Sequence, residues 1–408
     1  MTSQALDINR IQIIDAFRGF ALMGIVLVHM VEQFLAAAPT QEIRAGMVQG
    51  PLDQLVEVFL MLFVRGKFFA MFSFLFGLSF FIQMDRAAQR GVDYHGRFLW
   101  RVALLLVIGY IHSLFYRGDI LTIYAILAFV LVPFYRISDK YLFIFAAILM
   151  LGAGRYLVFA VYGGGTIFPF GGGEPELPHN VAYYDALLSG SLMDVFSQNA
   201  VYGHLSKLEF QINTFGRWYL TFAFFLLGLW AGRFRLFERL DELHLRFRKT
   251  LIVSACITIL LVVLTTVLFG IANQGQRDQL DTWVLMFAFT SLDLFNCALA
   301  TVLLCSFVLL YRRKSWGRVL GKLAPYGRTA LTNYVLQTLV GTFLFYNYGL
   351  GLLGAVSNAQ ALGIGILVIA FQIWLSAFWL RYFRYGPLEW LWRSGTRLSW
   401  QPLVRQPA

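Results

Sequence analysis

The feature that most constrains this chain is a series of long apolar runs separated by short charged segments. A helix needs about 20 mostly apolar residues to cross the roughly 30 Å hydrocarbon layer of a membrane. Hydrophobic residues make up 59% and charged residues 13% of the chain, whereas soluble domains average roughly 45–50% and about 25%. The sequence therefore predicts an all-α, polytopic transmembrane bundle of about ten helices. The runs are 14–36, 67–84, 98–116, 119–136, 141–162, 216–234, 250–271, 282–311, 329–349 and 360–382.

Most of the 33 Lys and Arg residues lie in segments between alternate runs, such as 86–101, 233–249 and 312–328. Because cytoplasmic segments of membrane proteins carry the excess of positive charge, this alternation predicts that both termini are cytoplasmic. The net charge of +11 would also suit nucleic-acid binding, but the charges form short clusters between apolar runs. We therefore expect membrane lipids as partners and no nucleic acid.

The positions of the runs divide the chain into three parts. We expect an N-terminal five-helix half at 1–162, an outer loop at 163–215 and a C-terminal five-helix half at 216–408. The outer loop begins with Gly- and Pro-rich irregular chain, and its later part has room for short surface helices, so it is either a lid or a plain connection. The stretch 51–64 is apolar but contains Asp53 and Glu57, which favours an interfacial helix. The three cysteines are at no metal-binding spacing, and we expect no metal.

The first run carries an unusual pair of ionisable residues, Arg18 and His29. Their spacing of eleven residues is close to three full helical turns, so both side chains lie on one face, about 16 Å apart along the axis. Arg18 is then near the cytoplasmic boundary and His29 at or beyond the middle of the membrane. Asp15, one turn before Arg18, can pair with it.

This layout fits a cytoplasmic acyl-coenzyme A as donor, with its phosphates on Arg18 and its pantetheine arm reaching toward His29. A neutral imidazole could then take a proton from an acceptor hydroxyl or amine. The structural alternatives are that Arg18 anchors the helix end at the interface and that His29 hydrogen-bonds a neighbouring helix.

Further polar residues converge on the outer half of the predicted bundle. They are Glu32, Arg65, Lys67, His112, Arg117 and Asp119. Asp119 either caps the next helix or orients His112 as a secondary catalytic pair, and His112 could also be a packed histidine. Glu32 is placed to orient His29, and the cations Arg65, Lys67 and Arg117 are candidates for binding an anionic acceptor.

Several motifs resemble a known family. The pattern Asp15, Arg18-Gly19 and His29 resembles the first helix of the transmembrane acyltransferase superfamily. The segments RGKFFAMFSFLFGLSF (65–80), IGYIH (108–112), GDILTIYA (118–125), ALTNYVLQ (330–337) and GPLEWLWR (386–393) resemble the YeiB-like proteins, also known as domain of unknown function 418. Where many YeiB-like proteins carry Asn, this chain has His29. The resemblance covers nearly the whole chain and implies a bacterial inner (cytoplasmic) membrane protein, with a homodimer suggested by superfamily relatives.

The leading functional hypothesis is a membrane-embedded acyltransferase that uses acyl-coenzyme A and a sugar, glycan or lipid acceptor. His29 is its expected general base, Arg18 and Asp15 its donor contacts. The alternative is a transporter or exporter of a small amphiphilic or anionic substrate, because intramembrane ionisable residues and an outer loop suit that function equally well.

Overall fold

The computed structural model describes residues 3–162, 178–212, 216–274 and 282–405, and the regular elements in these ranges are helices. In chain order they are α1 (Ser3–Val31), α2 (Gln41–Met47), α3 (Pro51–Phe59), the π-helix η1 (Leu60–Val64), α4 (Lys67–Ala88), α5 (His95–Phe115), α6 (Leu121–Phe134), α7 (Asp139–Met150), α8 (Ala153–Tyr162), α9 (Pro178–Leu188), α10 (Leu192–Ala200), α11 (Tyr202–Ile212), α12 (Arg217–Arg233), α13 (His244–Gln274), α14 (Thr282–Tyr311), α15 (Lys314–Gly321), α16 (Ala324–Arg328), α17 (Ala330–Phe345), α18 (Asn358–Tyr382) and α19 (Pro387–Arg397).

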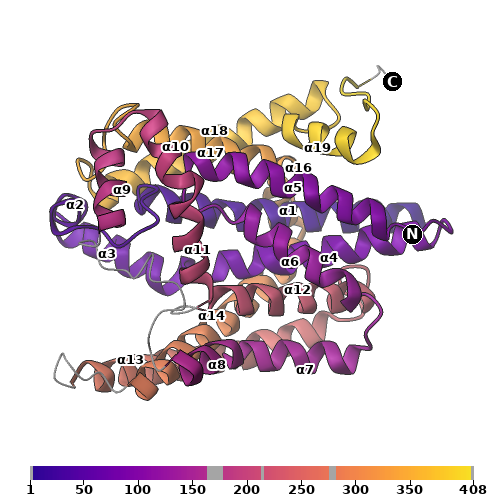
Figure 1. The fold of residues 1–408 in the computed structure, drawn as a ribbon. Helices are drawn as coiled ribbons and strands as arrows, with labels where there is room; N and C mark the ends of the chain where they lie inside the picture. Colours follow the sequence, from indigo (N-terminus) through magenta and orange to yellow (C-terminus); the bar gives the residue numbers. More distant parts are fainter. Residues whose placement is uncertain (1–2, 163–177, 213–215, 275–281, 406–408) are drawn as a thin grey trace.

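The long helices run roughly side by side, and both chain ends lie at one end of the bundle (Figure 1). We call this end, with α15 and α19, the terminal end, and the opposite end, with α2, α3, α9 and α10, the loop end. The helix α1 lies inside the bundle, where it packs against α4, α14, α16, α17 and α18. The core therefore surrounds the helix that carries Arg18 and His29.

Within the part of the chain that the structure describes, six helical segments are long and apolar enough to cross a membrane. They are Gln12–Val31, Pro51–Ala88, His95–Phe115, His244–Ala272, Trp283–Tyr311 and Asn358–Tyr382. The pair α7 and α8, bent by 50° at Gly152, makes a seventh if it forms one span. The chain is thus an all-helical, multi-pass membrane-type protein.

Each of the ten predicted runs contains a helix, but three of these helices are short. The helices α6, α12 and α17 have 14, 17 and 16 residues. At about 1.5 Å per residue they measure roughly 21–26 Å, less than the hydrocarbon layer. The count of ten crossings therefore stays a prediction, as does the division into two five-helix halves. The stretch 51–64 joins α4 in one long apolar segment, Pro51–Ala88.

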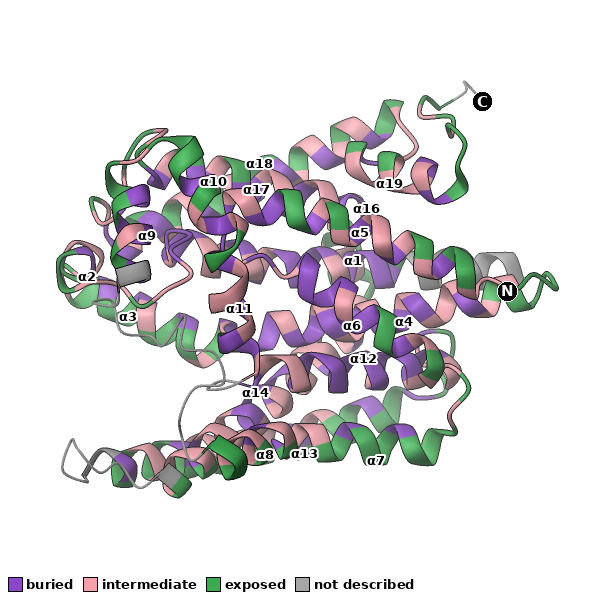
Figure 2. Ribbon diagram, in the orientation of Figure 1, coloured by how far each residue is buried: buried purple, intermediate pink, exposed green. Residues whose placement is uncertain are grey.

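The exposed surface of the bundle is itself apolar. In Figure 2 the buried residues gather around α1, α6 and α12, while the outer faces of α7 and α13 are exposed. In the span His244–Ala272 only 6% of the most apolar stretch is buried, although its mean hydropathy is 2.8. A surface of this kind would aggregate in water, and lipid is its natural surrounding.

Glycines allow close packing between α4 and α12. A Cβ on Gly77 would stand 2.0 Å from the Phe225 carbonyl oxygen, and one on Gly228 would stand 2.0 Å from that of Phe74. Small residues at such crossings let helix backbones approach each other closely in membranes. Gly232 faces Phe81, and Arg217 lies over Phe69. The two helices therefore run parallel, and both begin at the same end of the bundle.

The expected orientation can be measured with single cysteines in a variant in which Cys256, Cys297 and Cys305 are replaced by Ser. Met193→Cys is on the exposed side of α10 at the loop end, and Gln89→Cys is exposed where α4 ends at the terminal end. We expect a membrane-impermeant maleimide to label Met193→Cys in intact cells and Gln89→Cys only after the membrane is broken. The reverse pattern would contradict the cytoplasmic placement of the termini.

Candidate functional site

The helix α1 holds Arg18 by contacts with its own turn and with α4. The Arg18 Nη1 donates to Asp15 Oδ1 at 2.7 Å, and Nη2 donates to Ser79 Oγ at 3.1 Å. Asp15 is 8% exposed, so the pair expected from the sequence is present and largely buried. This arrangement places a guanidinium on the inner side of α1, toward the terminal end.

His29, three turns further along α1, points into the bundle. Its Nδ1 lies 3.5 Å from the Gln337 side-chain nitrogen on α17, and its ring packs against Phe34 and Tyr116 at centroid distances of 5.3 and 5.2 Å. A third ring, Tyr334, is 6.2 Å away. The imidazole thus faces other helices of the bundle.

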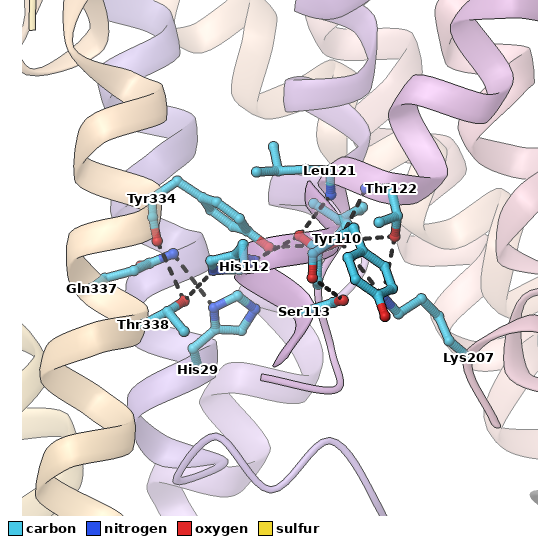
Figure 3. A network of polar contacts seen from close by, with 12 residues as sticks. His29, Tyr110, His112, Ser113, Leu121, Thr122, Lys207, Tyr334, Gln337 and Thr338 are labelled. Carbon is cyan, nitrogen blue, oxygen red and sulfur yellow. Dashed lines mark hydrogen bonds and ion pairs between the residues drawn. The ribbon is translucent and has the colours of Figure 1, made fainter. Parts of the chain in front are cut away.

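His112, near the end of α5, forms a buried chain of hydrogen bonds with Asp119 and Thr338 (Figure 3). The His112 Nδ1 is 2.7 Å from Asp119 Oδ1, and its Nε2 is 2.8 Å from Thr338 Oγ1. A carboxylate at Nδ1 favours the tautomer with its proton there, in which Nε2 accepts the hydrogen bond of the Thr338 hydroxyl. Along this chain of hydrogen bonds, the groups are a carboxylate, an imidazole and a hydroxyl.

Asp119 contacts both His112 and the start of α6, the two partners that the sequence suggested for it. Its carboxylate accepts the backbone N–H groups of Leu121 and Thr122 at 3.0 and 2.9 Å, at the start of α6. The same carboxylate accepts the Thr122 hydroxyl at 2.8 Å and orients His112. Asp119 is 2% exposed, and these bonds hold it rigidly.

Lys207, which was not among the predicted site residues, completes this network. Its Nζ lies 3.5 Å from Asp119 Oδ2 and donates to Thr122 Oγ1 at 3.1 Å. It comes from α11, in the later part of the predicted outer loop, which consists of the short helices α9, α10 and α11. His204, one turn earlier, contacts Ser113 Oγ at 3.1 Å. A lysine in a segment expected to be poor in positive charge was the available signal.

Tyr334 on α17 lies close to both histidines. Its ring centroid is 5.0 Å from that of His112 and 6.2 Å from that of His29. Its hydroxyl oxygen accepts the Ile120 N–H at 3.2 Å. Gln337 and Thr338, which follow Tyr334 by one turn, were not among the predicted site residues, yet Gln337 contacts His29 and Thr338 contacts His112.

A cavity of about 290 Å³ connects the terminal end with this tyrosine. Its walls are mostly apolar side chains of α4, α5 and α6, including Phe72, Phe76 and Leu105. At the terminal end it is lined by Arg18, Arg101, Arg328, Glu389 and Trp392, and at the inner end by Ile120, Tyr124 and Tyr334. His29 does not line this cavity, but its ring lies 6.2 Å from that of Tyr334, which does.

The remaining predicted site residues lie apart from the His112–Asp119 pair. Glu32 forms an ion pair of 2.7 Å with Arg65, so its carboxylate is directed to that guanidinium and the expected role of orienting His29 has no support. Lys67 is fully buried and donates to the Met61 carbonyl oxygen at 2.8 Å. Arg117 stacks on Tyr183 at 3.4 Å.

Comparison with known proteins assigns the chain to a family. Residues 231–399 match the family model described as "Protein of unknown function (DUF418)". The "Uncharacterized protein YxaH" of Bacillus subtilis (strain 168) is 31% identical over 418 aligned residues, covering 98% of this chain and 97% of that protein. The chain belongs to the DUF418, or YeiB-like, family.

Two further DUF418-type relatives are similar along their whole length. The "Uncharacterized protein YeiB" of Escherichia coli (strain K12) is 29% identical, covering 96% of this chain and 97% of that protein. The "Uncharacterized 39.9 kDa protein in amylase 3'region" of Bacillus acidopullulyticus is 30% identical, with 96% and 95% covered. The relatives are bacterial, and the apolar helices indicate a multi-pass protein of a bacterial membrane.

The buried ion pair of Lys207 and Asp119 can be tested by stability. Lys207→Met should lower the free energy of unfolding by about 3–5 kcal/mol, because it leaves a buried carboxylate without its cation. Asp119→Asn combined with Lys207→Met should lose less than the sum of the two single changes, with a coupling of about 0.5–3 kcal/mol. Thermal unfolding in detergent measures both.

The matched control is Lys249→Met, which removes an exposed lysine of α13 and should leave the melting temperature unchanged. Additive effects of the two changes at Lys207 and Asp119 would show that the pair does not interact as described.

Proposed function

We propose that this protein is a membrane-embedded acyltransferase. It takes an acyl group from acyl-coenzyme A at the terminal end and passes it to an acceptor that approaches from the loop end. The observation that carries the proposal is the cavity that begins among three guanidinium groups and ends at Tyr334, directly beside two histidines.

The terminal end of the cavity suits the donor. Arg18, Arg101 and Arg328 line it together, and guanidinium groups bind phosphates through paired hydrogen bonds. Arg101 is held in place by stacking on Trp392 at 3.5 Å. The apolar walls beyond them suit an extended thioester arm, since most small-molecule sites combine apolar walls with a few placed polar groups.

The inner end supplies groups for the chemistry. A neutral imidazole of His29 takes the proton of the acceptor O–H or N–H, and the freed oxygen or nitrogen attacks the thioester carbonyl carbon. The carbon–sulfur bond then breaks, and the departing sulfur receives the proton from the imidazolium. The products are an ester or amide and a free thiol.

Tyr334 is suited to stabilise the negative charge that develops on the thioester oxygen. Its oxygen already accepts the Ile120 N–H, which orients the phenol and strengthens its own O–H as a donor. His29 does not line the cavity, so the proposed reaction requires side chains at its inner end to rearrange before a bound donor reaches the imidazole. His112 and Asp119 are the secondary pair, since His112 Nε2 is bonded to the buried Thr338 hydroxyl.

Replacing the general base should abolish transfer. Inverted membrane vesicles from cells expressing the protein should incorporate radiolabelled acetyl groups from acetyl-coenzyme A, because the donor side then faces the medium. His29→Ala should reduce this incorporation by about 10²–10⁴-fold, the usual contribution of a general base. His244→Ala, which changes an exposed histidine of α13, is the matched control and should retain full incorporation.

Full activity of a folded His29→Ala protein would end the proposal for that residue.

The transporter alternative is favoured by the same observation of a cavity that is lined by cations at its terminal end. Uptake of a labelled amphiphile into proteoliposomes without release of any free thiol would support transport and contradict acyl transfer.

The donor contacts can be tested without knowing the acceptor. Arg101→Gln and Arg328→Gln should each weaken binding of coenzyme A to the purified protein by about tenfold, equivalent to about 1.4 kcal/mol, through loss of charge-assisted hydrogen bonds. Arg97→Gln is the control, because Arg97 is exposed one turn from Arg101 on α5 and does not line this cavity. Isothermal titration calorimetry gives the affinities, and equal affinities for all variants would refute this donor site.

A further inference from the structure

A second group of ionisable residues lies near the loop end, where α4 and α12 begin. We call it the basic cluster, and it consists of Arg65, Lys67, Arg155, Arg217, Glu32 and Asp293. We propose that the basic cluster binds a phosphate group of the acceptor. This inference rests on the proposed function for the identity of the ligand as acceptor, but the binding of phosphate can be measured by itself.

Two ion pairs occupy both carboxylates of the basic cluster. Glu32 pairs with Arg65 at 2.7 Å. Asp293 on α14 pairs with Arg155 on α8 at 2.5 Å. These pairs link four helices or their ends, and they leave the other two cations of the cluster without a close carboxylate.

Lys67 and Arg217 are the two cations in question. Lys67 is 0% exposed, with its Nζ bonded to the Met61 carbonyl oxygen and placed 4.5 Å from the centre of the Phe295 ring. The Arg217 guanidinium lies 4.7 Å from the centre of the Phe69 ring, with Asp293, Glu32, Arg155 and Arg65 as its charged neighbours. Among the residues that the structure describes, no carboxylate comes within ion-pair distance of either cation.

Helix ends add to this positive potential. Lys67 is the first residue of α4 and Arg217 the first of α12, and the preceding Gly66 and Gly216 provide no side-chain cap. A helix N-terminus carries a partial positive charge, so a cation there is unfavourable and an anion is stabilised. Because α4 and α12 run parallel and side by side, two N-termini and two unpaired cations meet at one place.

The charge balance identifies the class of ligand. Four cations and two carboxylates leave two positive charges, which match a phosphate dianion. An unpaired buried charge is costly in a membrane protein and usually marks a substrate or ion site. Arg presents a planar fork and Lys a point charge, and both are common phosphate ligands.

The position of the basic cluster relates it to the proposed chemistry. Glu32 follows His29 by three residues on α1, and Tyr116, whose ring packs on His29 at 5.2 Å, has Glu32 as a charged neighbour. The basic cluster thus adjoins His29. The cavity, in contrast, reaches Tyr334. A phosphate held there would bring an attached hydroxyl or amine toward His29.

Binding of inorganic phosphate to the purified protein in phosphatidylcholine nanodiscs is the first test, with chloride as the reference anion. The wild-type protein should bind phosphate in preference to chloride. Lys67→Met and Arg217→Gln should weaken phosphate binding at least about tenfold. Lys67→Arg should retain binding. Arg312→Gln, which removes an exposed guanidinium paired with Asp241, should leave it unchanged.

Two expected gains, one in phosphate affinity and one in melting temperature, distinguish this inference from simple misfolding, which would lower both. Glu32→Gln should increase phosphate affinity, because it releases Arg65 from its carboxylate. Lys67→Met should raise the melting temperature in the absence of phosphate, because it removes a buried charge that has no partner. Unchanged phosphate affinity in both Lys67→Met and Arg217→Gln, or no preference for phosphate over chloride, would overturn the proposal.

The source of the phosphate is tested in a second arm. If the ligand is a lipid headgroup, phosphatidic acid in the nanodisc should stabilise the wild-type protein and compete with inorganic phosphate. If it is a water-soluble phosphate ester, glycerol phosphate should compete and phosphatidic acid should not. His29→Ala should bind phosphate normally, so loss of acyl transfer with intact phosphate binding would bear on the proposed function alone.

Discussion

The Asp119 carboxylate is the interaction on which the middle of this bundle depends. A charge inside a membrane protein must be neutralised and hydrogen-bonded by the protein itself, because the hydrocarbon layer offers no water. Asp119 obtains this from His112 at the end of α5, Thr122 at the start of α6 and Lys207 on α11. One buried carboxylate thereby fixes the turn between α5 and α6 and attaches the short helix α11 to them.

The basic cluster near the same end is organised in the opposite way. Around Asp119 each ionisable group has a partner of opposite charge at close range, whereas Lys67 and Arg217 have none among the described residues. Fully paired groups rigidify a core, and unpaired groups retain their attraction for a ligand. The contrast separates a part of the molecule that holds its shape from the part that we propose to bind phosphate.

The sequence predicted the helices and the chemistry that is local in the chain. The pairing of Asp15 with Arg18 depends on helical spacing, and that of His112 with Asp119 depends on a short turn, so both could be inferred. Lys207 and Tyr334 could not, because they reach the site from helices far along the chain. Local reasoning also assigned Glu32 to His29, where Arg65 from the next segment forms the ion pair. The ten crossings rested on hydropathy, which registers apolar character more reliably than helix length.

The place of Tyr334, beside both histidines and at the inner end of the cavity, gives the proposed reaction a direction. The cavity reaches Tyr334 and the basic cluster adjoins His29, so in the proposed reaction donor and acceptor would meet beside this tyrosine. His29 itself does not line the cavity, so in the proposed reaction the side chains around Tyr334 would form a barrier between a bound thioester and the general base. Exclusion of water from a reactive donor until both substrates are present is a common function of such barriers.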